Sequence, residues 1–179
     1  MNQRKISKFL SYILRHNPSA IQLELDVQGW TTIEQLLIQL EKHQRPLSKE
    51  ELLQVVQDND KQRFKIDETG LRIRASQGHS IPIDLALETT QPPALLYHGT
   101  AQKNKTSILQ AGLQKRNRHQ VHLSSQRSTA LQVGSRHGQP LLFLVDCTAM
   151  QEAGHLFYLS DNGVWLTDHV PSQYLKEEG

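Results

Sequence analysis

The sequence has a single cysteine, Cys147, among 179 residues, and its formal net charge is only +2. One cysteine excludes a disulfide framework and a zinc site built from several cysteines. Cys147 follows an apolar run, so we expect a buried and unreactive thiol. The small net charge provides no overall basic field that would favour nucleic acid, and local clusters of arginine must decide that question.

The sequence also lacks an apolar run of the ~18 residues that a membrane-spanning helix requires. Its first residues lead into an amphipathic pattern instead of the apolar segment of a signal peptide. We therefore expect a cytoplasmic protein without a membrane partner, and the chain length favours a monomer. The glycine fingerprint of dinucleotide-binding folds and the phosphate-binding loop of P-loop enzymes are both missing. His119 and His122 have metal-like spacing, but no further ligand stands near them, so we expect no metal site.

The first half of the chain contains three helical patterns. Apolar residues recur at helical spacing from Ile6 to Leu14, and Arg15-His16-Asn17-Pro18 ends this helix because proline disfavours a helical residue before it. Thr32 begins a second helix, and Ser48 opens a third with a capping box. The basic pair that precedes Pro18 thus lies at a helix C-terminus, where the helix dipole alone would favour cations.

After the third helix the apolar period changes to two on both sides of a turn at residues 67–70, which predicts a hairpin. Three helices followed by a hairpin are typical of a winged-helix-like lobe, which we place at residues 1–75. One face of the hairpin carries four basic residues: Arg63, Lys65, Arg72 and Arg74. This face is either solvated surface or a strip that contacts phosphates.

Residues 76–93 lose periodicity and predict a connector, although Gln77-Gly78-His79-Ser80 is unusually polar for a passive spacer. Residues 94–179 combine short strands with small helices, which predicts a mixed α/β lobe and an α+β protein. In this lobe the strand at residues 95–97 is expected to stop at the corner His98-Gly99-Thr100. An imidazole, a bare backbone and a hydroxyl at such a corner suit a phosphate- or ribose-bearing ligand.

Several motifs, taken in their order along the chain, resemble one enzyme family, the NAD-dependent RNA 2′-phosphotransferases. The motifs are residues 7–16, 29–30, 61–64, 74–80, 97–100, 122–124, 134–138 and 162–167. The resemblance extends over residues 4–175. It implies an N-terminal winged-helix-like lobe that binds RNA and a C-terminal lobe, similar to ADP-ribosyltransferases, that binds NAD.

The resemblance also assigns roles to individual residues. The essential set of the family, which we expect to hold the transferred phosphate, matches Arg15, His16, Arg63 and Arg136. The residues expected to bind NAD are His98, Gly99, Thr100, Ser107, His122, Ser124 and Val164. Contacts to RNA or between the lobes are expected from Lys65, Arg74, Gln77 and His79, and the ligand of the last two stays open.

The implied activity removes an internal 2′-phosphate from RNA, as found at tRNA splice junctions, in two steps through an ADP-ribosylated intermediate. NAD is the co-substrate, and the products are RNA with a 2′-hydroxyl, ADP-ribose 1″,2″-cyclic phosphate and nicotinamide. Many protein-modifying ADP-ribosyltransferases have a glutamate at the position of Val164, which a phosphate nucleophile does not need. Two alternatives stay open: an ADP-ribosyltransferase acting on terminal phosphates or protein, and a winged-helix nucleic-acid binder without activity.

Overall fold

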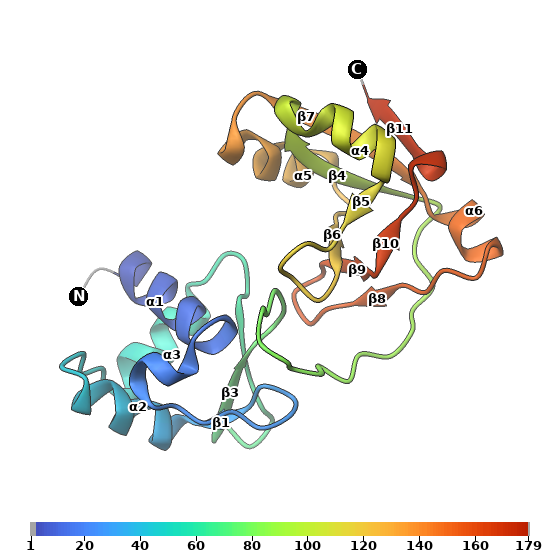
Figure 1. Ribbon diagram of the computed structural model, residues 1–179. Helices are drawn as coiled ribbons and strands as arrows, with labels where there is room; N and C mark the ends of the chain where they lie inside the picture. Colours follow the sequence, from blue (N-terminus) through green and yellow to red (C-terminus); the bar gives the residue numbers. More distant parts are fainter. Residues whose placement is uncertain (1–2, 179) are drawn as a thin grey trace. The chain divides into compact units, whose positions relative to one another are not determined.

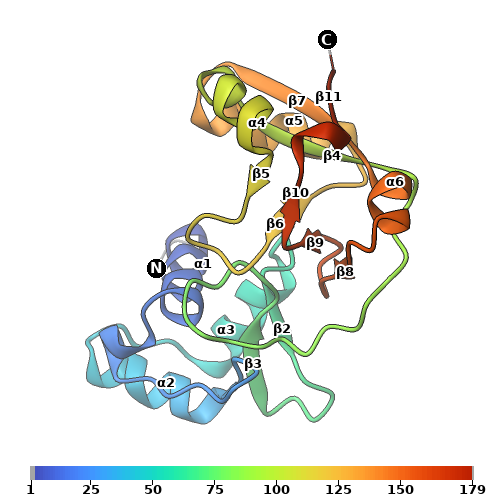
Figure 2. The same cartoon turned by 45° about the vertical axis from the view of Figure 1, so that its right-hand side comes forward.

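The computed structural model describes residues 3–178 and divides into two compact units, one up to Ala86 and one from Leu87 onward (Figure 1). Each unit has its own apolar core. Both units combine helices with small antiparallel sheets, as Figure 2 also shows, in agreement with the predicted α+β class. We call them the first and the second unit and describe each by itself.

In the described part of the first unit, the helices are α1 (Gln3–Arg15), α2 (Ile33–Lys42) and α3 (Lys49–Gln57), with the 3-10 turn η1 (Pro18–Ile21) after α1. The apolar face of α1 is fully buried at Leu10, Ile13 and Leu14. Burial of side chains of this size stabilises the fold by about 1.5–3 kcal/mol each. The amphipathic pattern read from the sequence therefore orients α1 in this unit.

The predicted helix starts are confirmed. Thr32 caps α2 by accepting a hydrogen bond from the backbone N–H of Gln35 at 3.1 Å. Ser48 and Glu51 form the capping box of α3, each side chain accepting from the backbone N–H of the other. These bonds satisfy N–H groups that the first helical turn leaves without partners, so the starts are determined by local sequence.

The predicted hairpin is also present. Strands β2 (Phe64–Ile66) and β3 (Arg72–Ala75) pair antiparallel, and β1 (Thr31–Thr32) adds to the other side of β3. Lys65 lies opposite Arg74, so their side chains leave the same face of the hairpin. Of these two side chains, that of Lys65 is exposed to solvent, whereas Arg74 is only 6% exposed. The expected strip of basic residues on one open face is therefore wrong at Arg74.

Up to residue 178, the second unit contains two three-stranded sheets and one two-stranded pair, all antiparallel. In one sheet β7 (Pro140–Asp146) lies between β4 (Leu95–Ala101) and β11 (Leu175–Glu178). In the other, β9 (Trp165–Thr167) lies between β6 (Val121–Leu123) and β8 (Tyr158–Leu159). The pair consists of β5 (Leu113–Gln114) and β10 (His169–Val170). Strands β8 and β9 form a hairpin, and β11 is formed by a charged stretch for which the sequence predicts no strand.

The helices of the second unit are α4 (Lys105–Ala111), α5 (Arg127–Gly134) and α6 (Cys147–Glu152), with the 3-10 turns η2 (Gln102–Asn104), η3 (Ser135–His137) and η4 (Ser172–Tyr174). Cys147 is buried at the start of α6, and burial raises the pKa of its thiol to about 12. The prediction that Cys147 is buried is thus confirmed, and its raised pKa disfavours the reactive thiolate. Within residues 3–178, no helix has the length and apolar character that crossing a membrane demands.

Strand β4 differs from its predicted form. It does not stop at a His98-Gly99-Thr100 corner but continues through all three residues to Ala101, paired along its length with β7. The pairing with β7 continues the strand, and the glycine is required instead by the close packing of α5 on β4. A Cβ atom added at Gly99 would lie 1.7 Å from the carbonyl oxygen of Ala130, and one added at Gly134 would lie 2.6 Å from that of Thr100. The glycine therefore serves helix-on-strand contact within a strand.

Residues 76–93, the expected connector, form backbone hydrogen bonds with the first unit at one end and with the second unit at the other. Ser80 N–H donates to Arg15 O at 3.0 Å and Asp84 N–H donates to Val27 O at 2.9 Å, so its first part belongs to the first unit. Thr90 N–H donates to Phe157 O at 2.8 Å, which attaches the last part to the second unit. Its polar motif is thereby held against α1 and the loop after η1.

Candidate active site

Two predicted catalytic residues of the first unit lie at the end of α1. Arg15 is the last residue of the helix, and its Nη2 donates to the backbone oxygen of Arg63 at 3.3 Å. This bond links the helix end to the segment that enters β2. A cation at a helix C-terminus also complements the helix dipole, so the position of Arg15 is favoured twice. Arg15 as a whole is half-buried.

Arg63 is held in place by a buried polar network. The Oδ1 atom of Asn59 accepts from the backbone N–H of Arg63 at 3.3 Å and from its Nη1 at 3.4 Å. Asn59 is 8% exposed, and its Nδ2 donates to the Oγ of Ser7 in α1 at 2.7 Å. A satisfied buried network of this kind rigidifies the groups attached to it. Arg15 and Arg63 are thus positioned by the same two segments.

His16 follows directly after α1 and is exposed. Its Nδ1 lies 2.9 Å from the Oγ of Ser80, whose backbone N–H binds Arg15 O. Arg15, His16 and Arg63 are therefore brought together around one helix end, as expected for groups that share a ligand. Ser80 was not among the predicted site residues, although it belongs to a motif that the sequence had singled out.

The other residues predicted to contact RNA have different surroundings. Arg74 stacks on Trp30 at 4.6 Å from the ring centroid, and its Nη1 donates to Leu85 O at 3.4 Å. His79 is 2% exposed and lies beside Gly29, where its Nε2 is 3.6 Å from the position of an added Cβ. Both side chains are buried within the first unit. Lys65 is exposed and Gln77 half-buried, so these two are the members of the set that can reach a ligand more readily.

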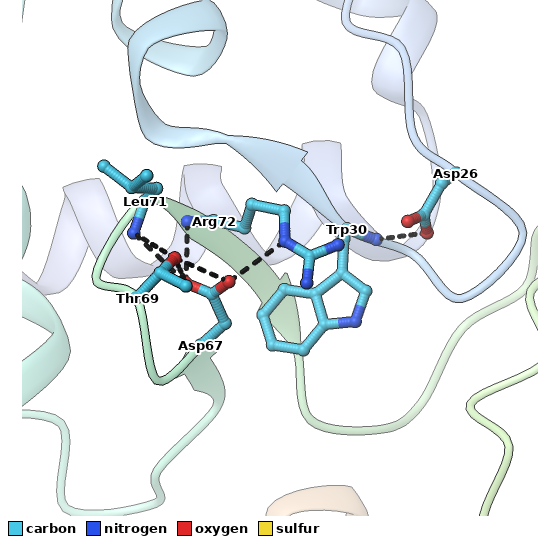
Figure 3. A network of polar contacts seen from close by, with 6 residues as sticks. All are labelled: Asp26, Trp30, Asp67, Thr69, Leu71 and Arg72. Atoms are coloured by element: carbon cyan, nitrogen blue, oxygen red, sulfur yellow. Dashed lines mark hydrogen bonds and ion pairs between the residues drawn. The ribbon is translucent and has the colours of Figure 1, made fainter.

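The indole of Trp30 contacts two basic residues of the hairpin, Arg74 and Arg72, the second of which is drawn in Figure 3. Arg72 also lies over its ring, at 5.3 Å, while the Nε of Arg72 binds Asp67 Oδ2 at 3.0 Å. Hydrogen bonds, chiefly from Arg72, lower the pKa of the Asp67 carboxyl to about 2. Asp26 accepts from the backbone N–H of Trp30 at 2.9 Å and fixes the turn that carries the indole. Two guanidinium groups on one indole are typical of cation–π stabilisation.

In the second unit, His98 lies in the middle of β4. Its Nδ1 is 3.1 Å from the backbone oxygen of His122, and a carbonyl only accepts, so Nδ1 carries the proton. Burial lowers the pKa of His98, and the charge of Arg118 lowers it further. The ring is therefore neutral near pH 7, and its Nε2 presents a lone pair.

His122 in β6 has the opposite arrangement. Arg118 Nη1 lies 2.8 Å from His122 Nδ1, and a guanidinium only donates, so Nδ1 accepts and the ring proton is on Nε2. Backbone hydrogen bonds between Tyr97 and Ser124, at 2.8 and 2.9 Å, join β4 to the residue after β6. The two histidines are thus neighbours, one offering an acceptor and the other a donor.

Arg118 is a functional candidate that was not predicted from the sequence. Partial burial lowers its pKa, but a guanidinium stays protonated near neutral pH. Much of the side chain remains exposed, so a bound anion can reach it. The available signal was its place four residues before His122, in a stretch considered only for metal ligands. Arg136, the arginine that the resemblance suggested, lies exposed in η3.

The remaining predicted NAD-binding residues lie on several elements of the second unit. Thr100 is 7% exposed and its Oγ1 accepts from Asn104 Nδ2 at 3.0 Å. Asn104 O in turn accepts from the hydroxyl of Ser107, which is exposed. Val164 is half-buried directly before β9, the strand that pairs with β6. Gly99 faces α5, so it supports the site by packing and has no surface for a ligand on that side.

Comparison with known proteins gives a consistent picture. The model of a family described as "RNA 2′-phosphotransferase, Tpt1 / KptA family" matches residues 1–169. A "Probable RNA 2′-phosphotransferase" of Trichormus variabilis is 53% identical over 97% of this chain and 95% of that protein. Proteins of the same name from Nostoc punctiforme and Hahella chejuensis are 50% and 53% identical, over 97% and 94% of this chain and 96% and 91% of those proteins.

Proposed function

Because this chain belongs to the RNA 2′-phosphotransferase family, an enzyme family that removes the 2′-phosphate of RNA, we propose that it transfers an internal RNA 2′-phosphate to NAD. We assign the RNA to the first unit, as a winged-helix-like lobe, and NAD to the second, as a lobe similar to ADP-ribosyltransferases. The proposal on NAD and on the two lobes is supported by the motifs of the sequence and by the chemistry of the side chains in each unit.

The observation that carries the proposal is the gathering of Arg15, His16 and Arg63 at the end of α1. A phosphate dianion in water is strongly hydrated, so a protein site must replace that hydration with several charge-assisted hydrogen bonds. Guanidinium groups supply such bonds in pairs and never lose their charge. The contacts of Arg15 with Arg63 O and of Arg63 with Asn59 hold these groups before any ligand arrives. The cluster suits a phosphate better than it suits a merely solvated helix end.

In the second unit, His98 and His122 support a ribose-binding role. A ribose hydroxyl both donates and accepts, and these rings offer an acceptor Nε2 and a donor Nε2 on neighbouring segments. We propose that they orient the nicotinamide ribose, with Val164 as an apolar neighbour and Thr100, Ser107 and Ser124 at the margin. An apolar Val164 is consistent with a phosphate nucleophile, which needs no carboxylate to activate it.

The proposed chemistry has two steps. An oxygen of the RNA 2′-phosphate first bonds to the anomeric carbon of the nicotinamide ribose, and nicotinamide leaves with the electron pair of the broken C–N bond. The ribose 2″-hydroxyl then gives up its proton and attacks phosphorus, the bond from phosphorus to the RNA 2′-oxygen breaks, and that oxygen takes up a proton. Phosphoryl transfer depends mainly on positioning and charge stabilisation. We assign these tasks to Arg15 and Arg63, and proton movement in the second step to His16.

A further arginine is needed where the ribose meets the phosphate, and the second unit offers two candidates. The resemblance points to Arg136, which we retain as a proposed catalytic residue. Arg118 is supported by geometry, since its guanidinium contacts the ring of His122 and still has exposed surface. We propose Arg118 as the arginine that acts beside the histidine pair.

The decisive experiment uses a short RNA that bears one internal 2′-phosphate, incubated with the protein with and without NAD, with the products resolved by mass. We expect loss of the phosphate only with NAD, together with ADP-ribose cyclic phosphate and nicotinamide. An unchanged RNA under both conditions would overturn the proposal.

Two other outcomes of this experiment separate the alternatives. Accumulation of ADP-ribosylated RNA without cyclic phosphate would indicate an ADP-ribosyltransferase that stops after the first step. RNA binding that is independent of NAD, without nicotinamide release, would indicate a nucleic-acid binder.

A further inference from the structure

Ser80 contacts the end of α1 twice, from a segment that lies 64 residues away from His16 in the sequence. Its backbone N–H donates to Arg15 O at 3.0 Å, and its Oγ lies 2.9 Å from His16 Nδ1. The first bond satisfies a carbonyl oxygen at the helix C-terminus, where the last oxygens have no intrahelical partner. The second bond joins a hydroxyl to a ring that can change its charge near neutral pH.

A serine hydroxyl is one of the few partners that can follow such a change. It has one proton to give and two lone pairs to receive, so it can donate to Nδ1 of the neutral ring and accept from Nδ1–H of the imidazolium. A carboxylate would favour the charged ring, and a backbone N–H would favour the neutral one. The contact with Ser80 therefore orients the imidazole without fixing its charge.

We propose that Ser80 is a positioning residue that holds His16 by its Nδ1 in both charge states, so that His16 exchanges its proton at Nε2. The consequence for catalysis rests on the proposed function, in which His16 moves a proton during the second step. The placement of the ring does not depend on it. Ser80 acts through His16 and has no assigned contact with substrate.

The two hydrogen bonds of Ser80 can be separated by substitution. Ser80→Ala removes the Oγ and keeps the backbone N–H that binds Arg15 O, so the loop stays attached to α1. Ser80→Thr keeps the hydroxyl and tests rescue. Ser19→Ala is a matched control, because Ser19 is also exposed near the end of α1 and its hydroxyl donates to a side-chain oxygen, that of Asn17, at 2.7 Å.

The experiment has a spectroscopic and a kinetic readout. In protein labelled with ¹⁵N in the histidine rings, with His16 assigned from a His16→Asn spectrum, we expect Ser80→Ala to shift the His16 ring nitrogens and change their pH titration. Single-turnover removal of the RNA 2′-phosphate should slow about tenfold, the size expected for one hydrogen bond to a charged group. Ser80→Thr should restore both readouts, and Ser19→Ala should change neither.

The two readouts keep this inference apart from the proposed function. Unchanged His16 resonances in Ser80→Ala would overturn the contact itself. Altered resonances with undiminished phosphate removal would overturn the positioning role. Altered resonances in a protein whose wild type removes no phosphate would leave the proposed function overturned and the placement of His16 by Ser80 supported.

Discussion

His16 in the first unit and His98 and His122 in the second are each held at Nδ1, by partners of different chemistry. In the second unit a carbonyl binds Nδ1 of His98 and a guanidinium binds Nδ1 of His122. Each partner can only accept or only donate, so each ring is locked in one neutral tautomer. In the first unit a hydroxyl, which does both, binds Nδ1 of His16. The difference is consistent with the roles proposed above, recognition for the His98 and His122 rings and proton movement for His16.

The two units also support their sites in different ways. A network of side chains through Asn59 fixes Arg63 in the first unit. In the second, β4 and α5 approach so closely that Gly99 and Gly134 have no room for a side chain. Polar networks tolerate exchange of one member at a limited cost, whereas close backbone packing does not. The predictions below test these contrasts.

The largest effect is expected at the end of α1. Arg15→Ala and His16→Ala should each slow the second step by ~10²–10³ or more, the size of losing one charge-stabilising group, and leave folding nearly intact. Rapid-quench measurement of the ADP-ribosylated intermediate checks this, because the intermediate should accumulate. Normal turnover by both variants would mean that the helix dipole alone explains the basic pair.

The next effect concerns stability. Gly99→Ala should lower the free energy of unfolding by about 3 kcal/mol, since the new Cβ meets the carbonyl oxygen of Ala130 in α5. Gly154→Ala is a suitable control, because Gly154 has a φ of +87° and nothing within 4 Å of an added Cβ, so only about 1 kcal/mol of backbone strain is expected. Urea unfolding of both variants measures the difference. Equal losses would contradict the close approach of β4 and α5.

The third prediction compares alanine substitutions of Arg118 and Arg136, the two candidate arginines of the second unit. Arg118→Ala should lower kcat/KM for NAD by about 10²-fold, because it removes a charge in contact with the His122 ring. Arg136→Ala should have a smaller effect, since Arg136 is exposed in η3. Steady-state kinetics with NAD as the varied substrate compares them, and the reverse order would favour the arginine chosen from the resemblance.

The smallest effect is a pH dependence. Burial lowers the pKa of His98 in the folded protein, so below its ordinary value the unfolded chain binds a proton that the folded chain does not. The contribution of His98 to stability is therefore present above the unfolded pKa and is lost as pH falls below it. His98→Asn keeps a donor for His122 O and cannot titrate.

The variant should lose less stability than the wild type when urea unfolding at about pH 7.5 is compared with that at about pH 5. Parallel losses in the two proteins would show that the ring of His98 is not buried as a neutral group.

The helices and strands that could be predicted from the sequence are those whose ends or faces are determined by residues close together in the chain. The capping box at Ser48, the proline after α1 and the alternation in the hairpin each act within a few residues. Strand β11 has no such signal, because Lys176, Glu177 and Glu178 read as a charged tail. Its pairing with β7 and the ion pairs of Glu177 with Lys105 and Glu178 with Arg127 form only in the folded unit.

The site residues, too, include some that local sequence motifs predict and others that only contacts in the folded protein identify. The family and the cluster of Arg15, His16 and Arg63 follow from motifs that can be read along the chain. Arg118 and Ser80 become candidates only when their partners, His122 and His16, are seen in contact. Arg74 and His79 belong to the same motif as Ser80, and their burial depends on Trp30 and Gly29 from another segment.

The contact of the Trp30 indole with the guanidinium groups of Arg72 and Arg74 has an optical consequence. The chain has two tryptophans, and the other, Trp165, lies in β9 of the second unit, so each unit contains its own intrinsic fluorophore. Emission of Trp30 depends on the positive charges over its ring, whereas Trp165 reports on the strands around His122. The tryptophan emission of a Trp165→Phe protein comes from the first unit alone, and that of a Trp30→Phe protein comes from the second. Unfolding of each unit can thus be followed by its own tryptophan fluorescence, without an added label.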